Sequence, residues 1–169
     1  MATTAAGTPY VESSDLVANY PGVSLALANH IDTIGKVLQV VRATDTTNRT
    51  TTSTSFVDVT GMAVTITCQQ ITSSILLIVP FYASAFGYGA YADYQITNAA
   101  NTAISGAQTL RLGSSANNLE NPLTLIGYDS PATLSAVTYK LRFKIAAGTS
   151  ANVLSANATG QMYAIEVAA

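Results

Sequence analysis

Hydrophobic and polar residues alternate with a period of two over most of the chain beyond residue 35. The alternation is clearest at residues 137–145, where odd positions are aliphatic or aromatic and even positions are threonine, lysine or arginine. Because successive side chains of a strand point to opposite faces of a sheet, this pattern predicts a strand over residues 137–146 with one buried and one solvated face. Similar runs predict strands at residues 36–44, 62–67, 75–86, 88–97, 119–127 and 161–167, with shorter or weaker ones at 56–59, 103–112 and 152–156.

Turn-forming residues separate these runs. Glycine, serine, threonine, aspartate and proline cluster at residues 60–61, 113–115, 129–131 and 148–150. About eight strands at this spacing, with no second helical run, predict an all-β fold. The two architectures that fit are an antiparallel β-sandwich and a jelly roll.

One segment before the predicted strands follows a helical period instead. Its apolar residues recur at spacings of four, four and three, which is one stripe of an amphipathic helix: Val23, Leu27, Ile31 and Ile34. Asn19 is a candidate N-cap, Pro21 suits the first turn, and Gly35 is a candidate C-cap. A helix of about fourteen residues is marginal alone in water, so its stripe must rest on the sandwich, a sister subunit or a larger particle. We therefore divide the chain into an N-terminal arm with this helix, residues 1–35, and a sandwich domain, residues 36–169.

The composition adds one unusual property, which is a shortage of charge. Nine acidic and seven basic residues make only 9% of the chain charged, against about 25% in an average domain. Alanine, threonine and serine occur 27, 23 and 15 times. A soluble monomer usually carries charge on roughly 25–35% of its surface. In this chain, either hydroxyl-bearing and small residues fill the exposed positions, or partner molecules cover much of the surface. Both suit an extracellular or virion assembly protein, and a low-charge monomer is the alternative.

The same composition argues against several partners and cofactors. Seven scattered basic residues do not form the basic stripe that phosphate binding requires, so no nucleic acid is expected. No apolar run reaches the length of about 18 residues that a membrane span needs, and no basic n-region indicates a signal peptide. One cysteine, Cys68, and one histidine, His30, do not supply a disulfide framework or the usual metal ligands. We expect no cofactor and no metal, with calcium held by backbone carbonyls left open.

Motifs for enzymatic chemistry are missing from the sequence. It contains no Gly-x-Ser-x-Gly elbow, no phosphate-binding glycine loop and no His-Glu-x-x-His. Asp93 and Asp129 each lie beside a tyrosine and are the best candidates for a glycosidase pair, although no spacing links them. We expect a protein that is not an enzyme and has no catalytic residues.

Residues 81–94 are the one segment whose composition suits ligand recognition. Four tyrosines, two phenylalanines, one acid and two glycines fall within it. Sugar-binding surfaces combine aromatic faces with a few polar groups, and the candidate glycan-binding residues are Tyr88, Tyr91, Asp93 and Tyr94. A structural role is the favoured interpretation. Two strands joined near residues 87–89 would place these aromatic side chains in the core and a subunit interface, since Tyr82, Tyr88 and Tyr94 share parity.

Two runs of the sequence resemble a known class of virion module. Residues 35–44 read GKVLQVVRAT, and residues 50–67 read TTTSTSFVDVTGMAVTIT. They resemble the opening strand and hairpin of β-sandwich modules in tail-fibre, minor tail and head-decoration proteins of tailed bacteriophages. Residues 75–82, 94–97 and 163–167 are similar to later strands of such modules, whereas residues 99–135 match least. Residues 8–32 resemble the segments that precede these modules in phage minor tail proteins.

The resemblance implies a homotrimeric accessory protein on the virion surface, assembled in the cytoplasm of the host bacterium. Its N-terminal segment would dock to a major capsid or tail protein, and its sandwich would face outward as capsid decoration or a short fibre. The residues expected to make the docking or oligomer contact are Tyr10, Leu16, Val17, Tyr20, Val23, Leu27, Ile31 and Ile34. The alternative is a fibre or minor tail module that recognises a host surface glycan through the tyrosine-rich segment.

Overall fold

The computed structural model describes residues 37–113, 115 and 118–168, together with residues 2–3, 9–10 and 24–25. The chain divides into two compact units, Met1–Lys36 with Ala169, and Val37–Ala168. In the first unit β1 (Ala2–Thr3) pairs antiparallel with β2 (Pro9–Tyr10), and residues 24–25 are helical. The rest of the predicted helix lies outside the described residues, so that helix stays a prediction.

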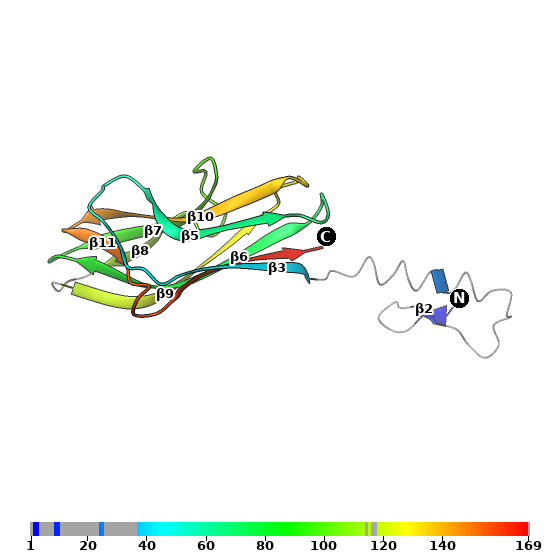
Figure 1. Cartoon of the computed structure of the whole chain (residues 1–169), viewed down its shortest axis with the longest axis horizontal. Coiled ribbons are helices and arrows are strands. Elements are labelled where there is room, and N and C mark those ends of the chain that lie inside the picture. The colour runs from blue at the N-terminus through cyan, green and yellow to red at the C-terminus, as the bar shows by residue number, and fades with distance from the viewer. Residues whose placement is uncertain are drawn as a thin grey trace. The chain divides into compact units, whose positions relative to one another are not determined.

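The second unit consists of two antiparallel sheets that pack face to face (Figure 1). The smaller, four-stranded sheet has the order β5 (Val57–Thr67), β10 (Ala136–Ala147), β7 (Tyr91–Asn98), β8 (Leu110–Gly113). The larger, six-stranded sheet has the order β3 (Val37–Asp45), β12 (Gly160–Val167), β6 (Ser74–Phe86), β11 (Ser150–Val153), β4 (Arg49–Thr51), and β9 (Asn118–Asp129) pairs with the other side of β6. The predicted all-β antiparallel sandwich is confirmed.

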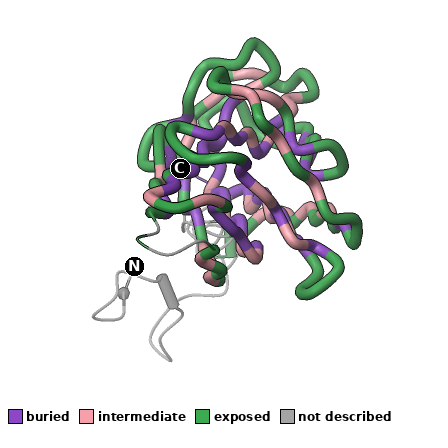
Figure 2. The backbone as a smooth tube through the Cα atoms, turned by 90° about the vertical axis from the view of Figure 1, so that its left-hand side faces the viewer, coloured by how far each residue is buried: buried purple, intermediate pink, exposed green. Residues whose placement is uncertain are grey.

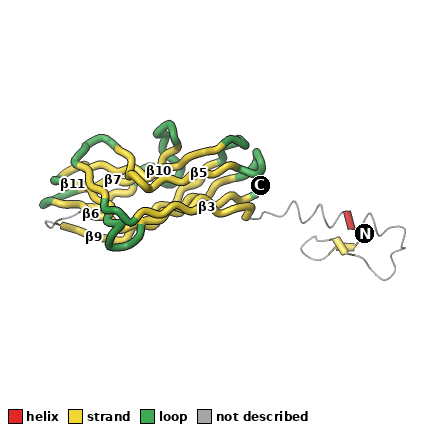
Figure 3. The backbone as a smooth tube through the Cα atoms, viewed as in Figure 1, coloured by secondary structure: helices red, strands yellow, loops and turns green. Residues whose placement is uncertain are grey.

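Individual strands differ from their predicted extents where the periodicity is weak. The runs at 56–59 and 62–67 form one strand, β5, because Gly61 continues the chain at a φ of +91°. Strand β4 was not predicted, since three residues of a threonine-rich run are too few to show alternation. Consecutive strands often lie in opposite layers, so neighbours within a sheet are distant in sequence (Figure 3).

Strand β6 is the centre of the larger sheet. It pairs with β9 along its length on one side, and on the other with β12 over residues 74–78 and with β11 over residues 83–86. Pro80 lies between these two stretches, where the neighbouring strand changes and a missing N–H costs no ladder bond. The alternate side chains of Ile75, Leu77 and Val79 have no exposed surface and belong to the hydrophobic core. Figure 2 shows how buried stretches of backbone alternate with exposed ones in the sandwich.

Specific contacts close both long sides of the sandwich. On one side Ile104 N donates to Ile96 O at 2.9 Å and Tyr128 N donates to Ser105 O at 3.0 Å. The loop before β8 therefore joins β7 of the smaller sheet to β9 of the larger. On the other side a Cβ at Gly61 would lie 2.7 Å from Cγ of Asp45, so this close approach of β5 to β3 requires glycine.

A buried carboxylate fixes the end of the sandwich at the turn between β5 and β6. Glu166 has no exposed surface, and it accepts hydrogen bonds from Gln39 Nε2 at 2.6 Å and from the backbone N–H groups of Gln69 and Gln70 at 2.7 and 3.2 Å. The same Gln39 Nε2 donates to Thr67 O at 2.6 Å. Burial by itself would raise the pKa of Glu166, but the hydrogen bonds outweigh burial and hold the pKa below its ordinary value of 4.5.

We expect Glu166→Gln to lower the free energy of unfolding by about 1–3 kcal/mol at neutral pH, because an amide NH₂ then faces two backbone donors. The folded-state pKa is depressed. The charge therefore stabilises the fold fully above the unfolded pKa, and this stabilisation is lost as pH falls through the folded value. Urea unfolding between about pH 3 and pH 7 tests this, with the exposed Glu120→Gln as control. The variant should lose less stability than the unsubstituted protein below pH 4.5, and equal slopes would contradict the assignment.

Candidate functional site

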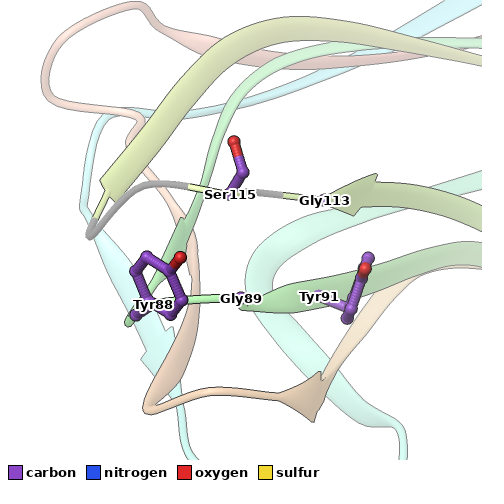
Figure 4. A pocket seen from close by; sticks show the side chains of 5 residues that line it. All are labelled: Tyr88, Gly89, Tyr91, Gly113 and Ser115. Atoms are coloured by element: carbon purple, nitrogen blue, oxygen red, sulfur yellow. The ribbon is translucent and has the colours of Figure 1, made fainter.

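The tyrosine-rich segment forms a surface pocket where β6 turns into β7. Gly87 and Gly89 have φ values of +114° and +66°, so the turn lies in the left-handed region that glycine adopts without strain. Between them Tyr88 is 82% exposed. A cavity of about 460 Å³ is lined by Tyr88, Gly89, Tyr91, Gly113 and Ser115 (Figure 4). Two tyrosines therefore reach the surface together at one end of the sandwich.

Tyr91 is held between β8 and an arginine. A Cβ at Gly113, its cross-strand partner, would lie 2.8 Å from Cε1 of Tyr91, so the ring packs directly on the backbone of β8. The guanidinium carbon of Arg111 lies 5.6 Å from the ring centroid, within the range of a cation–π contact. The ring is thus oriented by its neighbours while remaining 45% exposed.

Beneath this pair lies a buried carboxylate with two cations. Asp93 is 1% exposed; its Oδ1 is 2.6 Å from Arg111 Nε and its Oδ2 is 2.9 Å from Arg111 Nη2. Lys144 Nζ lies 3.6 Å from the same Oδ2. The hydrogen bonds from Arg111, supported by both positive charges, hold the pKa of Asp93 below its ordinary value despite burial. Two cations facing one carboxylate leave a net positive charge beside the tyrosines.

Tyr94 belongs to the core instead of the pocket. Its hydroxyl donates to Ser84 O at 3.2 Å and Asn152 O at 2.8 Å, so it links β7 to two strands of the larger sheet. Its ring centroid lies 5.1 Å from that of Phe81 and 6.5 Å from that of Phe143. Burial raises the pKa of its hydroxyl well above the ordinary value. It has no exposed surface to offer a ligand.

The four predicted glycan-binding residues therefore fall into three environments. Tyr88 and Tyr91 share the pocket, Asp93 lies below it behind Arg111, and Tyr94 is buried. The shared parity of the tyrosines was misleading, because the glycine turn carries the chain from one sheet to the other between Tyr88 and Tyr94. Arg111 and Lys144 were missed, since only strand pairing brings them to Asp93.

The other predicted sites are partly outside the described residues. Of the docking residues only the backbone of Tyr10, in β2, is described, and the remaining seven lie outside. Cys68 is buried, and burial, followed by the nearby charge of Glu166, raises the pKa of its thiol. Among the described residues no cluster of histidine, cysteine and acidic side chains suits a metal ion. Nor does this part of the chain contain a helix long and apolar enough to cross a membrane.

The two candidate members of a glycosidase pair have separate partners. Asp93, on β7 of the smaller sheet, binds Arg111, whereas Asp129, on β9 of the larger sheet, accepts a hydrogen bond from the Tyr139 hydroxyl at 2.7 Å. Asp93 is bound within its own sheet by its cross-strand partner Arg111, whereas Asp129 is bound across the two layers, because Tyr139 lies on β10 of the smaller sheet. Nothing in these contacts assigns the two acids to a common site.

Comparisons with known proteins add little to this description. No protein-family model matches the chain, and no curated protein matches it. One solved structure that matches the chain is that of the infectious bursal disease virus VP2 subviral particle, with a TM-score of 0.44 and 14% identity. The match covers 79% of this chain and 33% of that one, so the chain spans about a third of the length of that protein. Function is therefore inferred from the residues themselves.

We expect Tyr94→Phe to lower the free energy of unfolding by about 1–2 kcal/mol, because two buried carbonyls lose their shared donor. Tyr88→Phe is the matched control and should leave stability unchanged, since its hydroxyl is exposed. Urea titration of both variants measures the difference. Equal stability of the two variants would show that the Tyr94 hydroxyl does not hold the layers together.

Proposed function

We propose that the chain is a non-enzymatic structural protein of a bacteriophage particle. It stands on the particle surface as a homotrimer, as capsid decoration or a short fibre, and is assembled in the cytoplasm of the host bacterium. Residues 1–35 dock it to a major capsid or tail protein, and the sandwich faces outward. The resemblance of residues 35–44 and 50–67 to phage sandwich modules supports this role.

The proposed structural role is best supported by the hydrogen bonds that the acidic side chains accept. All six between residues 37 and 168 accept hydrogen bonds from other side chains of the sandwich: Asp45, Asp58, Asp93, Glu120, Asp129 and Glu166. A general acid or base needs a proton-transfer atom within reach of a substrate. These carboxylates instead tie neighbouring strands and turns together. A scaffold whose carboxylates are all engaged by its own side chains suits a building block better than a catalyst.

Docking through the N-terminal segment is supported by its sequence pattern. The stripe of Val23, Leu27, Ile31 and Ile34 offers apolar area, and apolar burial contributes about 25 cal/mol per Å². A threefold arrangement presents three such segments at once, so weak single contacts add up through effective concentration. Leu25, which lies off the stripe, is 62% exposed.

The attachment is tested with a phage whose copy of the gene is deleted and replaced by a variant. We expect Leu27→Glu with Ile31→Glu to remove the protein from purified particles, because a partner surface would have to bury two charges. Leu25→Glu with Asn29→Glu, on the opposite side of the predicted helix, is the matched control and should be incorporated normally. Immunoblots and electron microscopy of the particles provide the measurement.

Two outcomes would count against this proposal. Particles that contain none of the unsubstituted protein would remove the virion role altogether. Incorporation of the stripe variant at the level of the control would keep the virion role and place the docking surface elsewhere.

Glycan recognition is a second candidate function, favoured by the pocket of Tyr88 and Tyr91. Both aromatic faces reach the surface, and Arg111, which is 56% exposed, keeps its charge beside them. Aromatic faces can stack on the C–H groups of a sugar, and a guanidinium can donate charge-assisted hydrogen bonds to its acidic or hydroxyl oxygens. Tyr88 and Tyr91 belong to the segment whose composition suggested such binding, and Arg111 is added from β8.

We expect Tyr88→Ala with Tyr91→Ala to weaken binding to a glycan array or to host cells by at least about tenfold, since both stacking faces are lost. Leu134→Ala removes an exposed apolar side chain between β9 and β10, away from the pocket, and serves as control. Unchanged binding by the double variant, or no binding by the unsubstituted protein, would exclude this function for the pocket.

A further inference from the structure

The outer surfaces of the two sheets differ sharply in chemistry. Four of the six basic residues of the sandwich lie on the outer face of the smaller sheet, Arg111, Lys140, Arg142 and Lys144, where they pair with Asp58 and Asp93. Thr65 and Thr138, whose hydroxyls hydrogen-bond at 2.7 Å, extend this polar face. It is therefore the face built for contact with water.

The outer surface of the larger sheet is apolar over four adjacent strands. Directly paired residues of a sheet project to the same side, and the registers of β3, β12, β6 and β9 place two such rows next to each other. The first row is Val40, Ile165, Leu76 and Tyr128, and the second is Arg42, Tyr163, Ile78 and Ile126. We call these eight residues the apolar face.

The apolar face is exposed in the single chain. Val40, Ile126 and Tyr128 are each 56% exposed. The only charge in the two rows, on Arg42, lies 5.7 Å from the centroid of the Tyr163 ring and so covers another part of the same face. With strands about 4.8 Å apart and rows about 7 Å apart, the face and its margins cover on the order of 400 Å².

We propose that this apolar face packs against neighbouring copies of the same chain. The inference rests on the proposed function only for the number of copies. In a trimer with a threefold axis, the β3 edge of the apolar face of one copy meets the β9 edge of the apolar face of the next copy. The two rows of each copy then form a hydrophobic core that the three copies share. An area on the order of 400 Å² is about half of one side of a standard interface. The polar residues that follow along the strands, Thr44, Gln161 and Thr124, supply its rim.

The charge balance favours another copy over a different partner. Between residues 37 and 168 the chain has six acidic and six basic residues, so copies of the sandwich carry no net charge to repel one another. The eight residues of the apolar face include a single cation, Arg42, which is too little charge to bind an anionic partner such as a nucleic acid or an acidic peptide. A second copy supplies a flat surface of the same polarity, and sheets pack face to face in this way inside the sandwich itself.

The test uses the full chain and measures its mass by light scattering during size exclusion. We expect Val40→Glu with Ile126→Glu to raise the dissociation constant of the assembly at least about 100-fold, because each contact would bury an unpaired charge. Ala63→Glu with Thr65→Glu adds the same charge to exposed positions of β5 on the polar face, and it should keep the mass of the unsubstituted protein. Circular dichroism confirms that both variants fold.

Each outcome separates this inference from the proposed function. If the apolar-face variant assembles as the unsubstituted protein does, the inference is overturned but the proposed trimer is not. If the unsubstituted protein is a dimer and the apolar-face variant dissociates it, the inference is upheld but the proposed trimer is overturned. An unsubstituted protein that stays at 17.5 kDa overturns both.

A second measurement does not depend on dissociation. Val40→Cys with Ile126→Cys should give covalent oligomers with a bis-maleimide, whereas Ala63→Cys with Thr65→Cys should not. Cys68 is buried and does not interfere. Cross-links in the control pair alone would place the contact on the polar face and overturn the inference.

Discussion

Strand β6 is the element on which the larger sheet depends. Its pairing with β9 on one side and with β12 and β11 on the other holds three strands directly, and β3 and β4 join the sheet only through these partners. Two requirements meet in its sequence. Inward residues such as Leu77 and Val79 must fill the core, and the strand must change its neighbour near Pro80, where the ring removes a donor that no partner uses. The outward residues of β6 are thereby held at fixed positions on the outer surface of the larger sheet.

The outer surfaces of the two sheets therefore differ in chemistry. The smaller sheet carries most of the cations of the sandwich and the carboxylates that pair with them, whereas the larger sheet carries the apolar face. A domain with so little charge gains from gathering it on one side, because the other side is then free to be covered by copies without burying ions. The proposed role in a symmetric particle and the proposed contact between copies both follow from this separation.

The scarce charges and polar groups that are buried serve the architecture. Glu166 binds the backbone amides of the turn between β5 and β6, Asp93 orders Arg111 and through it Tyr91, and the Tyr94 hydroxyl joins the two layers. A buried polar group stabilises a fold only when it is fully hydrogen-bonded. Each of these groups has its partners within the sandwich, so the fold is specified by a few satisfied contacts in addition to apolar packing.

The sequence by itself determined the class of the fold, because period-two alternation reports which residues of a strand face inward without reference to any partner. It also located the segment that holds Tyr88 and Tyr91. It did not determine that Tyr94 is buried, that Arg111 lies over Tyr91, or that Val40, Ile165, Leu76 and Tyr128 form one row. Those facts depend on which strands pair and in which register. Pairing joins residues far apart in the chain, and the alternation of a single strand carries no information about its neighbour. Only the tertiary structure decided them.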